Sequence, residues 1–154
     1  MARCRNNYVV PMNGEDIEEV IRKHSPAHFG SLRHSVDFAC EEGDPIYAAA
    51  SGEVVWLRND SNVGGPNKKY WLKGNRIVIK HKNDEYTAYE HLKYRGAVVR
   101  VGEKVKQRQL IGYSGNTGYS LGPHLHFEVF NNPSRDLSEG ETLQVFFREL
   151  LRGK

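Results

Sequence analysis

The sequence predicts a mostly β protein, an antiparallel β-sandwich with a two-sheet core and a short helix near each end. β-branched and aromatic residues come in short runs cut by Gly, Asn, Asp and Pro, which is typical of strands joined by turns. The 154 residues suit one domain, and the 15 glycines fit a chain with many turns. With 38% hydrophobic and 27% charged residues, the composition allows a packed core and excludes a disordered or fibrous chain. The apolar runs are far shorter than the roughly 20 residues of a membrane-spanning helix.

The expected helices lie at the two ends of the chain. Ile17, Val20 and Ile21 are spaced at i, i+3 and i+4, which predicts a short amphipathic helix over residues 14–24. Apolar residues between 143 and 151 form a second stripe, and Gly153 is a plausible stop. We therefore divide the single domain 1–154 into an N-terminal extension with a short helix (1–27), a β core (28–131) and a C-terminal helical segment (132–154).

The core contains the expected strands. Residues 82–84 predict a hairpin turn between two of them, and residues 59–75 predict a long exposed loop, of a kind that is usually functional or mobile. The expected strands are residues 36–39, 46–49, 53–57, 76–81, 86–91, 98–101, 110–113 and 124–130.

Histidines and one aspartate are the candidate functional residues. His124 and His126 alternate with apolar residues, so on a strand they share one face with Glu128. Asp37 lies between Val36 and Phe38, where a carboxylate faces either solvent or a compensating cation. His91 ends its strand, and its parity with Thr87 and Tyr89 predicts that these three share a face. Imidazoles together with a carboxylate are a ligand set that suits zinc.

Several motifs, in one order, resemble the lysostaphin-type zinc endopeptidases, which cut peptide bonds in bacterial cell-wall peptidoglycan. The resemblance runs from His28 to Phe130, about two thirds of the chain. The motifs that carry it are Val36-Asp37-Phe38-Ala39, Gly43-Asp44-Pro45-Ile46-Tyr47-Ala48-Ala49, Gly52-Glu53-Val54-Val55, Gly74-Asn75-Arg76-Ile77-Val78-Ile79-Lys80-His81, Tyr89-Glu90-His91-Leu92, Val101-Gly102-Glu103-Lys104-Val105, Ile111-Gly112-Tyr113-Ser114-Gly115-Asn116-Thr117-Gly118 and Gly122-Pro123-His124-Leu125-His126-Phe127-Glu128-Val129.

The resemblance implies a role for individual residues. Asp37 and His126 would be ligands of one Zn²⁺ per chain, and His91 and His124 would be two catalytic histidines that do not bind the metal. Many members carry the first ligand four residues before the aspartate, where this chain has Arg33. Others carry it further upstream in a His-x-Gly context, which His28 resembles.

Three histidines therefore compete for the place of the first ligand. His34 lies three residues from Asp37, so in a regular strand the two side chains would point to opposite faces. His24 lies at the end of the expected N-terminal helix. We expect His28 to be the ligand, and we interpret His81 as a structural or surface residue.

Further residues near the site receive weaker assignments. Asn75 resembles a family position near the site, and we expect a substrate-binding or structural role for it. Glu90 and Glu128 are available as partners of the histidines, although a solvated strand position is the simpler interpretation of each. The loop 59–75 and the segment 114–123 could wall a groove on either side of the metal.

The expected function is that of a zinc-dependent endopeptidase acting on peptidoglycan stems or cross-bridges, as a monomer. The rival of another class is a non-catalytic peptidoglycan-binding or regulatory module of the same fold. A lipoyl or biotinyl carrier is disfavoured because no lysine lies in a recognisable attachment motif. Nucleic acid is not an expected partner, because the net charge is only +3 and the basic residues are scattered. The family predicts an extracellular or envelope location, yet the N-terminus lacks the apolar core of a signal peptide.

Overall fold

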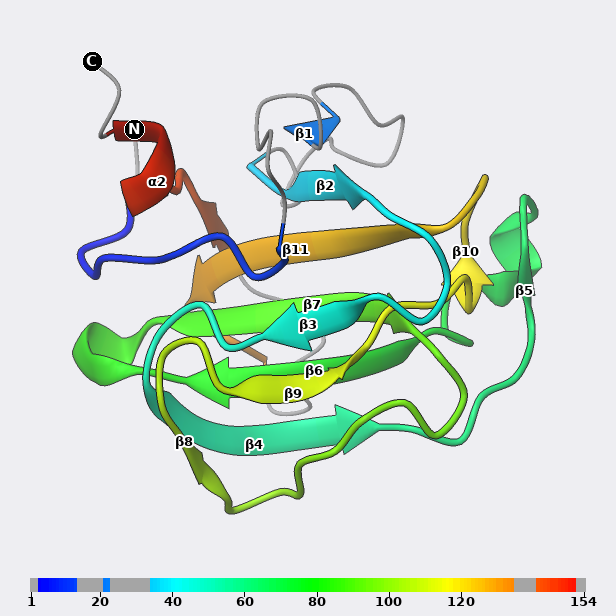
Figure 1. Ribbon diagram of the computed structural model, residues 1–154, viewed down its shortest axis with the longest axis horizontal. Coiled ribbons are helices and arrows are strands. Elements are labelled where there is room, and N and C mark those ends of the chain that lie inside the picture. Colours follow the sequence, from blue (N-terminus) through cyan, green and yellow to red (C-terminus); the bar gives the residue numbers. More distant parts are fainter. Residues whose placement is uncertain (1–2, 14–20, 23–33, 135–140, 152–154) are drawn as a thin grey trace.

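Most of the strands form one large antiparallel sheet in the computed structural model, which describes residues 3–13, 21–22, 34–134 and 141–151 (Figure 1). The alternation of apolar and polar residues along its long strands gives the sheet two chemically different faces. In spatial order the sheet contains β1 (Ile21–Arg22), β2 (Val36–Ala39), β11 (His124–Asn131), β7 (Tyr86–Leu92), β6 (Asn75–Lys80), β4 (Gly52–Arg58) and β8 (Lys104–Val105), with β12 (Glu141–Leu143) also paired to β11.

A second, two-stranded antiparallel sheet covers one face of the large sheet. It consists of β3 (Pro45–Tyr47) and β9 (Leu110–Tyr113), which lie in front of β6 and β7 in Figure 1. Between the two layers lies the main core, in which the apolar residues of every second strand position are buried. Its largest members, all less than 2% exposed, are Tyr8, Phe38, Ile46, Ile77, Ile79, Tyr89, Leu92, Ile111, Leu125 and Phe127. The antiparallel, mostly β fold expected from the sequence is confirmed.

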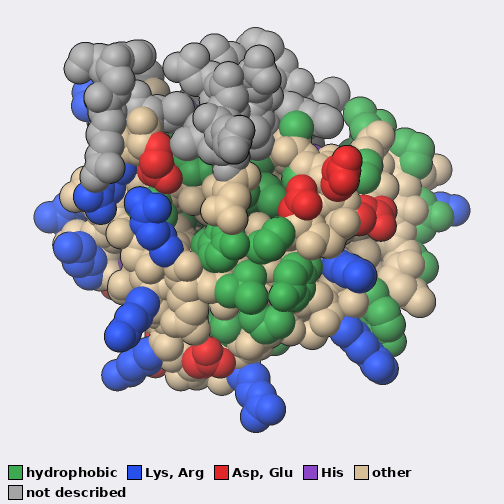
Figure 2. All heavy atoms as spheres, viewed as in Figure 1, with side chains coloured by type: hydrophobic (Ala, Val, Ile, Leu, Met, Phe, Trp, Pro, Cys, Tyr) green, Lys and Arg blue, Asp and Glu red, His purple; other side chains and the backbone are tan. Residues whose placement is uncertain are grey.

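Charge is spread around the margin of this covered side rather than gathered in one patch. Figure 2 shows hydrophobic side chains over β3 and β9, with Lys and Arg side chains around the rim. Among the described residues, no helix is long and apolar enough to cross a membrane.

The strand boundaries agree closely with the sequence in places and differ in others. Residues 36–39 and 110–113 form strands as predicted, and residues 82–84 form a 3-10 turn (η3, Lys82–Asp84) in which Asn83 adopts a left-handed φ of 62°. Residues 98–101 do not form a strand. Val98 and Val101 are 52% and 60% exposed there, so only part of this valine-rich run is drawn into the core.

The expectation of terminal helices needs correction. Ile21 and Arg22 are not helical but pair with Phe38 and Asp37 of β2, and the rest of the expected helix 14–24 lies outside the described residues. At the other end, residues 141–143 form strand β12, and within the described residues 141–151 only α2 (Arg148–Leu151) is helical. Leu143 and Phe147 are nonetheless buried, so these two members of the apolar stripe face the core, whereas Phe146 is 43% exposed.

The loop 59–75 also contains regular structure. It forms β5 (Gly64–Gly65) and the 3-10 turn η2 (Lys68–Tyr70), and β5 pairs in parallel with β10 (Gly118–Tyr119). The loop and the segment 114–123 therefore build one common wall, instead of flanking the site from two sides.

Candidate functional site

A row of polar residues crosses four neighbouring strands on the face of the large sheet opposite the main core. Asp37 on β2 pairs directly with His126 on β11, which pairs with Glu90 on β7, which in turn pairs with Arg76 on β6. Directly opposed residues of antiparallel strands have Cβ atoms about 4.5–5.5 Å apart, so these side chains are neighbours. Sheet register therefore assembles the row from four separate parts of the chain.

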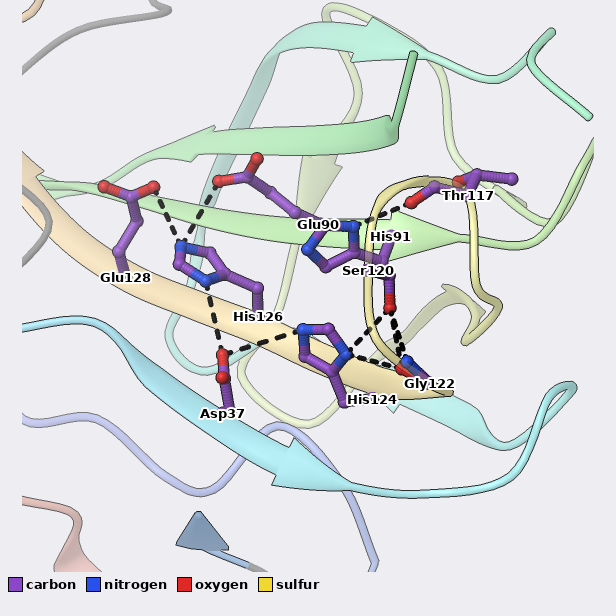
Figure 3. Close-up of polar contacts among 9 residues, drawn as sticks. All are labelled: Asp37, Glu90, His91, Thr117, Ser120, Gly122, His124, His126 and Glu128. Carbon is purple, nitrogen blue, oxygen red and sulfur yellow. Dashed lines mark hydrogen bonds and ion pairs between the residues drawn. The ribbon is translucent and has the colours of Figure 1, made fainter. Parts of the chain in front are cut away.

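His126 lies at the centre of this row, between three carboxylates (Figure 3). Its Nδ1 lies 3.3 Å from Asp37 Oδ1, while its Nε2 lies 3.4 Å from Glu128 Oε1 and 3.6 Å from Glu90 Oε2. Glu90 is also paired with Arg76, whose Nε lies 3.6 Å from its Oε2.

Burial and charge act in opposite directions on the pKa values of this cluster. Burial by itself would lower the pKa of His126, but Glu90, Asp37 and Glu128 raise it well above 6.5. Burial would raise the pKa of Glu90, but Arg76 and His126 lower it to about 2. The pKa of Glu128 is raised, mainly by burial. The sequence suggested solvated positions for both glutamates, whereas Glu128 is buried.

His91 and His124 are held in the same way, each by a backbone carbonyl. His91 Nδ1 lies 2.7 Å from Thr117 O, and His124 Nδ1 lies 2.8 Å from Gly122 O. Because a carbonyl oxygen only accepts, each Nδ1 carries a proton and donates it. In the neutral ring, Nε2 then keeps the lone pair, and His124 Nε2 lies 3.8 Å from Asp37 Oδ1. The two rings are neighbours, with centroids 4.5 Å apart.

His91 reaches this site because the strand is irregular at that residue. The register between β6 and β7 shifts at Asn75 and Arg76, so that His91 is skipped in the pairing, and its φ is 68°. A left-handed φ is unfavourable for a residue with a Cβ and is found mainly where the surroundings impose it. The prediction that His91 shares a face with Thr87 and Tyr89 is therefore wrong: Tyr89 points into the core, whereas His91 lies against His124.

Asn75 and Thr117 fix the backbone around His91. Asn75 is fully buried; its Oδ1 accepts from Ser61 N at 2.9 Å, and its Nδ2 donates to the carbonyl oxygens of Ser61, Leu92 and Lys93. Thr117 Oγ1 accepts from Asn75 N and donates to Leu92 O. These bonds join the loop 59–75, the end of β7 and the segment 114–123 into one support.

The donor atoms around Asp37 fit a zinc ion. Two ligand atoms bound to a tetrahedral zinc at about 2.0–2.1 Å lie about 3.3–3.4 Å apart, which agrees with the 3.3 Å between His126 Nδ1 and Asp37 Oδ1. The cluster also contains three carboxylates and a single guanidinium, so with neutral imidazoles it holds two uncompensated negative charges. Charge buried without compensation is strongly unfavourable, and one divalent cation would compensate both charges.

Most candidates for the first metal ligand lie outside the described residues. His28, His24 and Arg33 all lie between residues 23 and 33, which the structure does not describe, so the expected ligand His28 remains a prediction. His34 is described: it precedes β2, and its backbone N lies 3.4 Å from Thr142 Oγ1 on β12. β12 pairs with the end of β11 remote from His124 and His126.

Arg76 and Thr117 were not recognised as site residues from the sequence. A basic residue at the start of a strongly apolar strand was a signal for Arg76, but its partner Glu90 follows only from the register of two strands. Thr117 holds His91 through its backbone carbonyl, which any residue type would offer, and its hydroxyl bonds to Asn75 N and Leu92 O depend on tertiary contacts that no local sequence pattern records.

Known proteins are similar to this chain in sequence and in fold. Residues 31–137 match the model of the family described as Peptidase family M23. The peptidoglycan DD-endopeptidase ShyA of Vibrio cholerae is 41% identical over 96 residues, which cover 62% of this chain and 20% of ShyA. The chain thus spans about a fifth of the length of this curated relative.

Two solved structures of peptidases are also similar to this chain. The catalytic domain of lysostaphin from Staphylococcus simulans is 32% identical with a TM-score of 0.55, and the match covers 72% of this chain and 74% of that one. A zinc-containing peptidase from Vibrio cholerae is 31% identical with a TM-score of 0.59, covering 80% of this chain and 36% of that one. Because the family model matches residues 31–137, which is more than half of the chain, the chain belongs to peptidase family M23, a family of peptidoglycan-hydrolysing metalloproteases.

Proposed function

We propose that this chain is a zinc-dependent endopeptidase that hydrolyses peptide bonds in peptidoglycan stems or cross-bridges. The observation that carries the proposal is the convergence of Asp37 and His126 Nδ1 with the imidazoles of His91 and His124, whose Nδ1 atoms are both engaged by carbonyls. One zinc ion per chain would be held by Asp37, His126 and His28. Zinc bound there lowers the pKa of water and polarises a carbonyl oxygen.

His91 and His124 handle the protons in this proposal. Burial, reinforced by the neighbouring His124 and His126, lowers the pKa of His91 to about 4, so its ring is neutral at neutral pH. A neutral imidazole with its lone pair on Nε2 accepts the proton of the attacking water. The imidazolium formed in this way returns the proton from Nε2 to the departing amine. The second imidazole, with its ring centroid 4.5 Å away, would donate from Nε2 to the developing oxyanion when that nitrogen is protonated, because its Nδ1 proton is already donated to a backbone carbonyl. The two histidines share these duties.

The wall built by β5 and β10 is the proposed contact surface for the peptide substrate. Tyr119 packs against Trp71, which is 49% exposed, and the neighbouring Leu72 is 71% exposed. This wall adjoins the catalytic histidines, because Thr117 immediately precedes β10 and holds His91. Asn75 is buried, and we assign it the structural part of its expected role, supporting the wall.

A non-catalytic module of the same fold is the less favoured function. A module of that kind would have lost metal ligands or catalytic residues. Here Asp37, His91, His124 and His126 are all present and lie together, which favours the enzyme.

Elemental analysis together with a cleavage assay tests the proposal. We expect one zinc per chain, hydrolysis of purified peptidoglycan peptides, loss of hydrolysis after chelation, and recovery when zinc is returned. Undiminished hydrolysis by the metal-free protein would contradict the proposal. Zinc binding without hydrolysis of any wall peptide would instead support the non-catalytic module.

A further inference from the structure

The two ring nitrogens of His126 face different groups, and only one of them can bind the proposed metal ion. Nδ1 faces Asp37, whereas Nε2 faces Glu90 and Glu128. Oxygen and nitrogen atoms of Glu90, His126 and Glu128 lie within 4.8 Å of one another, so this side too has the composition of a metal site. The inference that follows rests on the proposed function and concerns which side binds the ion.

The glutamate side already contains a cation. Arg76 is 9% exposed, and its Nε lies 3.6 Å from Glu90 Oε2. Its guanidinium carbon lies 5.6 Å from the ring centre of Trp56 and 5.9 Å from that of Phe130, so two aromatic rings hold it in place. A second cation at Glu90 would be repelled by this buried positive charge.

The aspartate side offers a second imidazole instead of a cation. His124 Nδ1 donates to Gly122 O, so the lone pair of its Nε2 is 3.8 Å from Asp37 Oδ1. On this side the donor pair is His126 Nδ1 with Asp37 Oδ1, and the neutral ring of His124, which is not a ligand in the proposed function, adds no positive charge. We therefore place the metal at Nδ1, and this leaves Nε2 as the nitrogen that carries the proton.

We propose that Glu128 and Glu90 are positioning residues, which keep the proton of His126 on Nε2 and so turn the Nδ1 lone pair towards Asp37. Each nitrogen faces carboxylate oxygen, but Nε2 faces two carboxylates and Nδ1 faces one. In a neutral ring the N–H is therefore favoured at Nε2, and the lone pair, which a metal ion at Asp37 would attract, is favoured at Nδ1. At 3.4 and 3.6 Å the contacts are longer than a typical hydrogen bond of about 2.7–3.2 Å, so the two carboxylates act as ion-pair partners on either side of the nitrogen. A carboxylate beside the second nitrogen of a metal-binding histidine fixes its tautomer and ring orientation. Arg76 keeps Glu90 in place in this arrangement.

Zinc affinity in glutamate variants tests the proposal. In competition with a chromophoric chelator, Glu128→Leu should bind zinc about 10–100-fold more weakly, the usual effect of losing such a partner. Glu128→Gln keeps an acceptor oxygen and should recover part of the loss. Glu85→Leu is the matched control, since Glu85 is a buried carboxylate that accepts hydrogen bonds from Asn6 N and Tyr8 Oη, outside the row at His126. It should lower stability and leave the zinc affinity unchanged.

The tautomer of His126 gives an independent readout on the unmodified protein. Long-range ¹H–¹⁵N spectra of histidine-labelled protein should show the proton on Nε2, both with zinc bound and in the neutral metal-free ring. A proton on Nδ1, or a Glu128→Leu variant with wild-type zinc affinity, would overturn the proposal. Failure of the unmodified protein to bind zinc would refute the proposed function instead, and the metal-free spectrum would still decide the assignment of Nε2.

Discussion

The histidines of this site differ in which nitrogen they present, because backbone carbonyls hold two of the rings and carboxylates surround the third. His91 and His124 donate from Nδ1 to Thr117 O and Gly122 O, and they keep a lone pair on Nε2. His126 instead faces Asp37 with Nδ1. Through the groups that hold them, the histidines are thus suited to the two different roles that we propose, metal ligand and proton carrier.

His81 illustrates the opposite case of a histidine with a structural role. It is buried, with Nδ1 2.7 Å from Ser51 O and Nε2 2.8 Å from Thr87 Oγ1. Burial lowers its pKa below 6.5, although Ser51 and Glu85 act against this. Of the two interpretations that the sequence leaves open for His81, a structural or a surface residue, its burial favours the structural one.

The pH dependence of folding stability should show the contribution of the buried, neutral His81. Because its pKa is lower in the folded than in the unfolded state, the unfolded chain binds more protons below pH 6.5. Its contribution is therefore present above that pH and is lost on acidification. Denaturant unfolding of the wild type and His81→Gln at about pH 8 and about pH 5 checks this. The wild type should lose more stability than the variant, and equal losses would contradict the assignment.

Among the elements, the wall of β5 and β10 depends on close backbone contact. Gly118 has a φ of +83°, and a Cβ placed there would lie 2.8 Å from Gly74 Cα and 3.3 Å from His91 Nδ1. Neither the left-handed conformation nor the space admits a side chain. The neighbouring Thr117 carbonyl holds His91, so packing in this wall positions a residue for which we propose a catalytic role.

Substitution of Gly118 should therefore lower both activity and stability. Gly118→Ala is expected to lower peptide cleavage at least about tenfold, because small displacements of catalytic groups are costly. Gly102→Ala is the control for backbone strain alone: Gly102 has a φ of +92°, but a Cβ added there would meet no atom within 4 Å. Both variants should lose about 1 kcal/mol or more of stability from this strain, and Gly118→Ala should lose more because its Cβ also meets the backbone of Gly74. Equal cleavage rates for the two variants would show that the wall does not position His91.

Elements with clear periodicity could be predicted from the sequence, and local irregularities could not. The alternation in His124–Asn131 correctly placed His124 and His126 on one face. The bulge at His91 depends on the register between β6 and β7, which no local pattern records. Leu143 belongs to the apolar stripe that predicts a helix, yet it lies in β12 because the end of β11 offers a free edge for pairing.

At the scale of the whole molecule, the two ends of strand β7 have different roles: the chain termini pack near its start, and the candidate site lies near its end. The N-terminal residues 3–13 lie beside the C-terminal segment, with bridges from Arg3 to Gln144 and from Tyr8 to Phe147. Buried Tyr8 donates to Glu85, which immediately precedes β7. His91 lies near the far end of the same strand, about 20 Å away at about 3.3 Å per residue. Packing of the termini and the candidate chemistry are thus separated along β7.

Zinc content per chain, measured beside peptide cleavage in three histidine variants, tests the central claim most directly. His126→Ala and His28→Ala should lose the metal and all turnover, because each removes a proposed ligand. His124→Ala should keep one zinc per chain and lose turnover, because it removes a proton carrier. A His126→Ala protein that retains its zinc, or a His124→Ala protein that cleaves at the wild-type rate, would contradict the account.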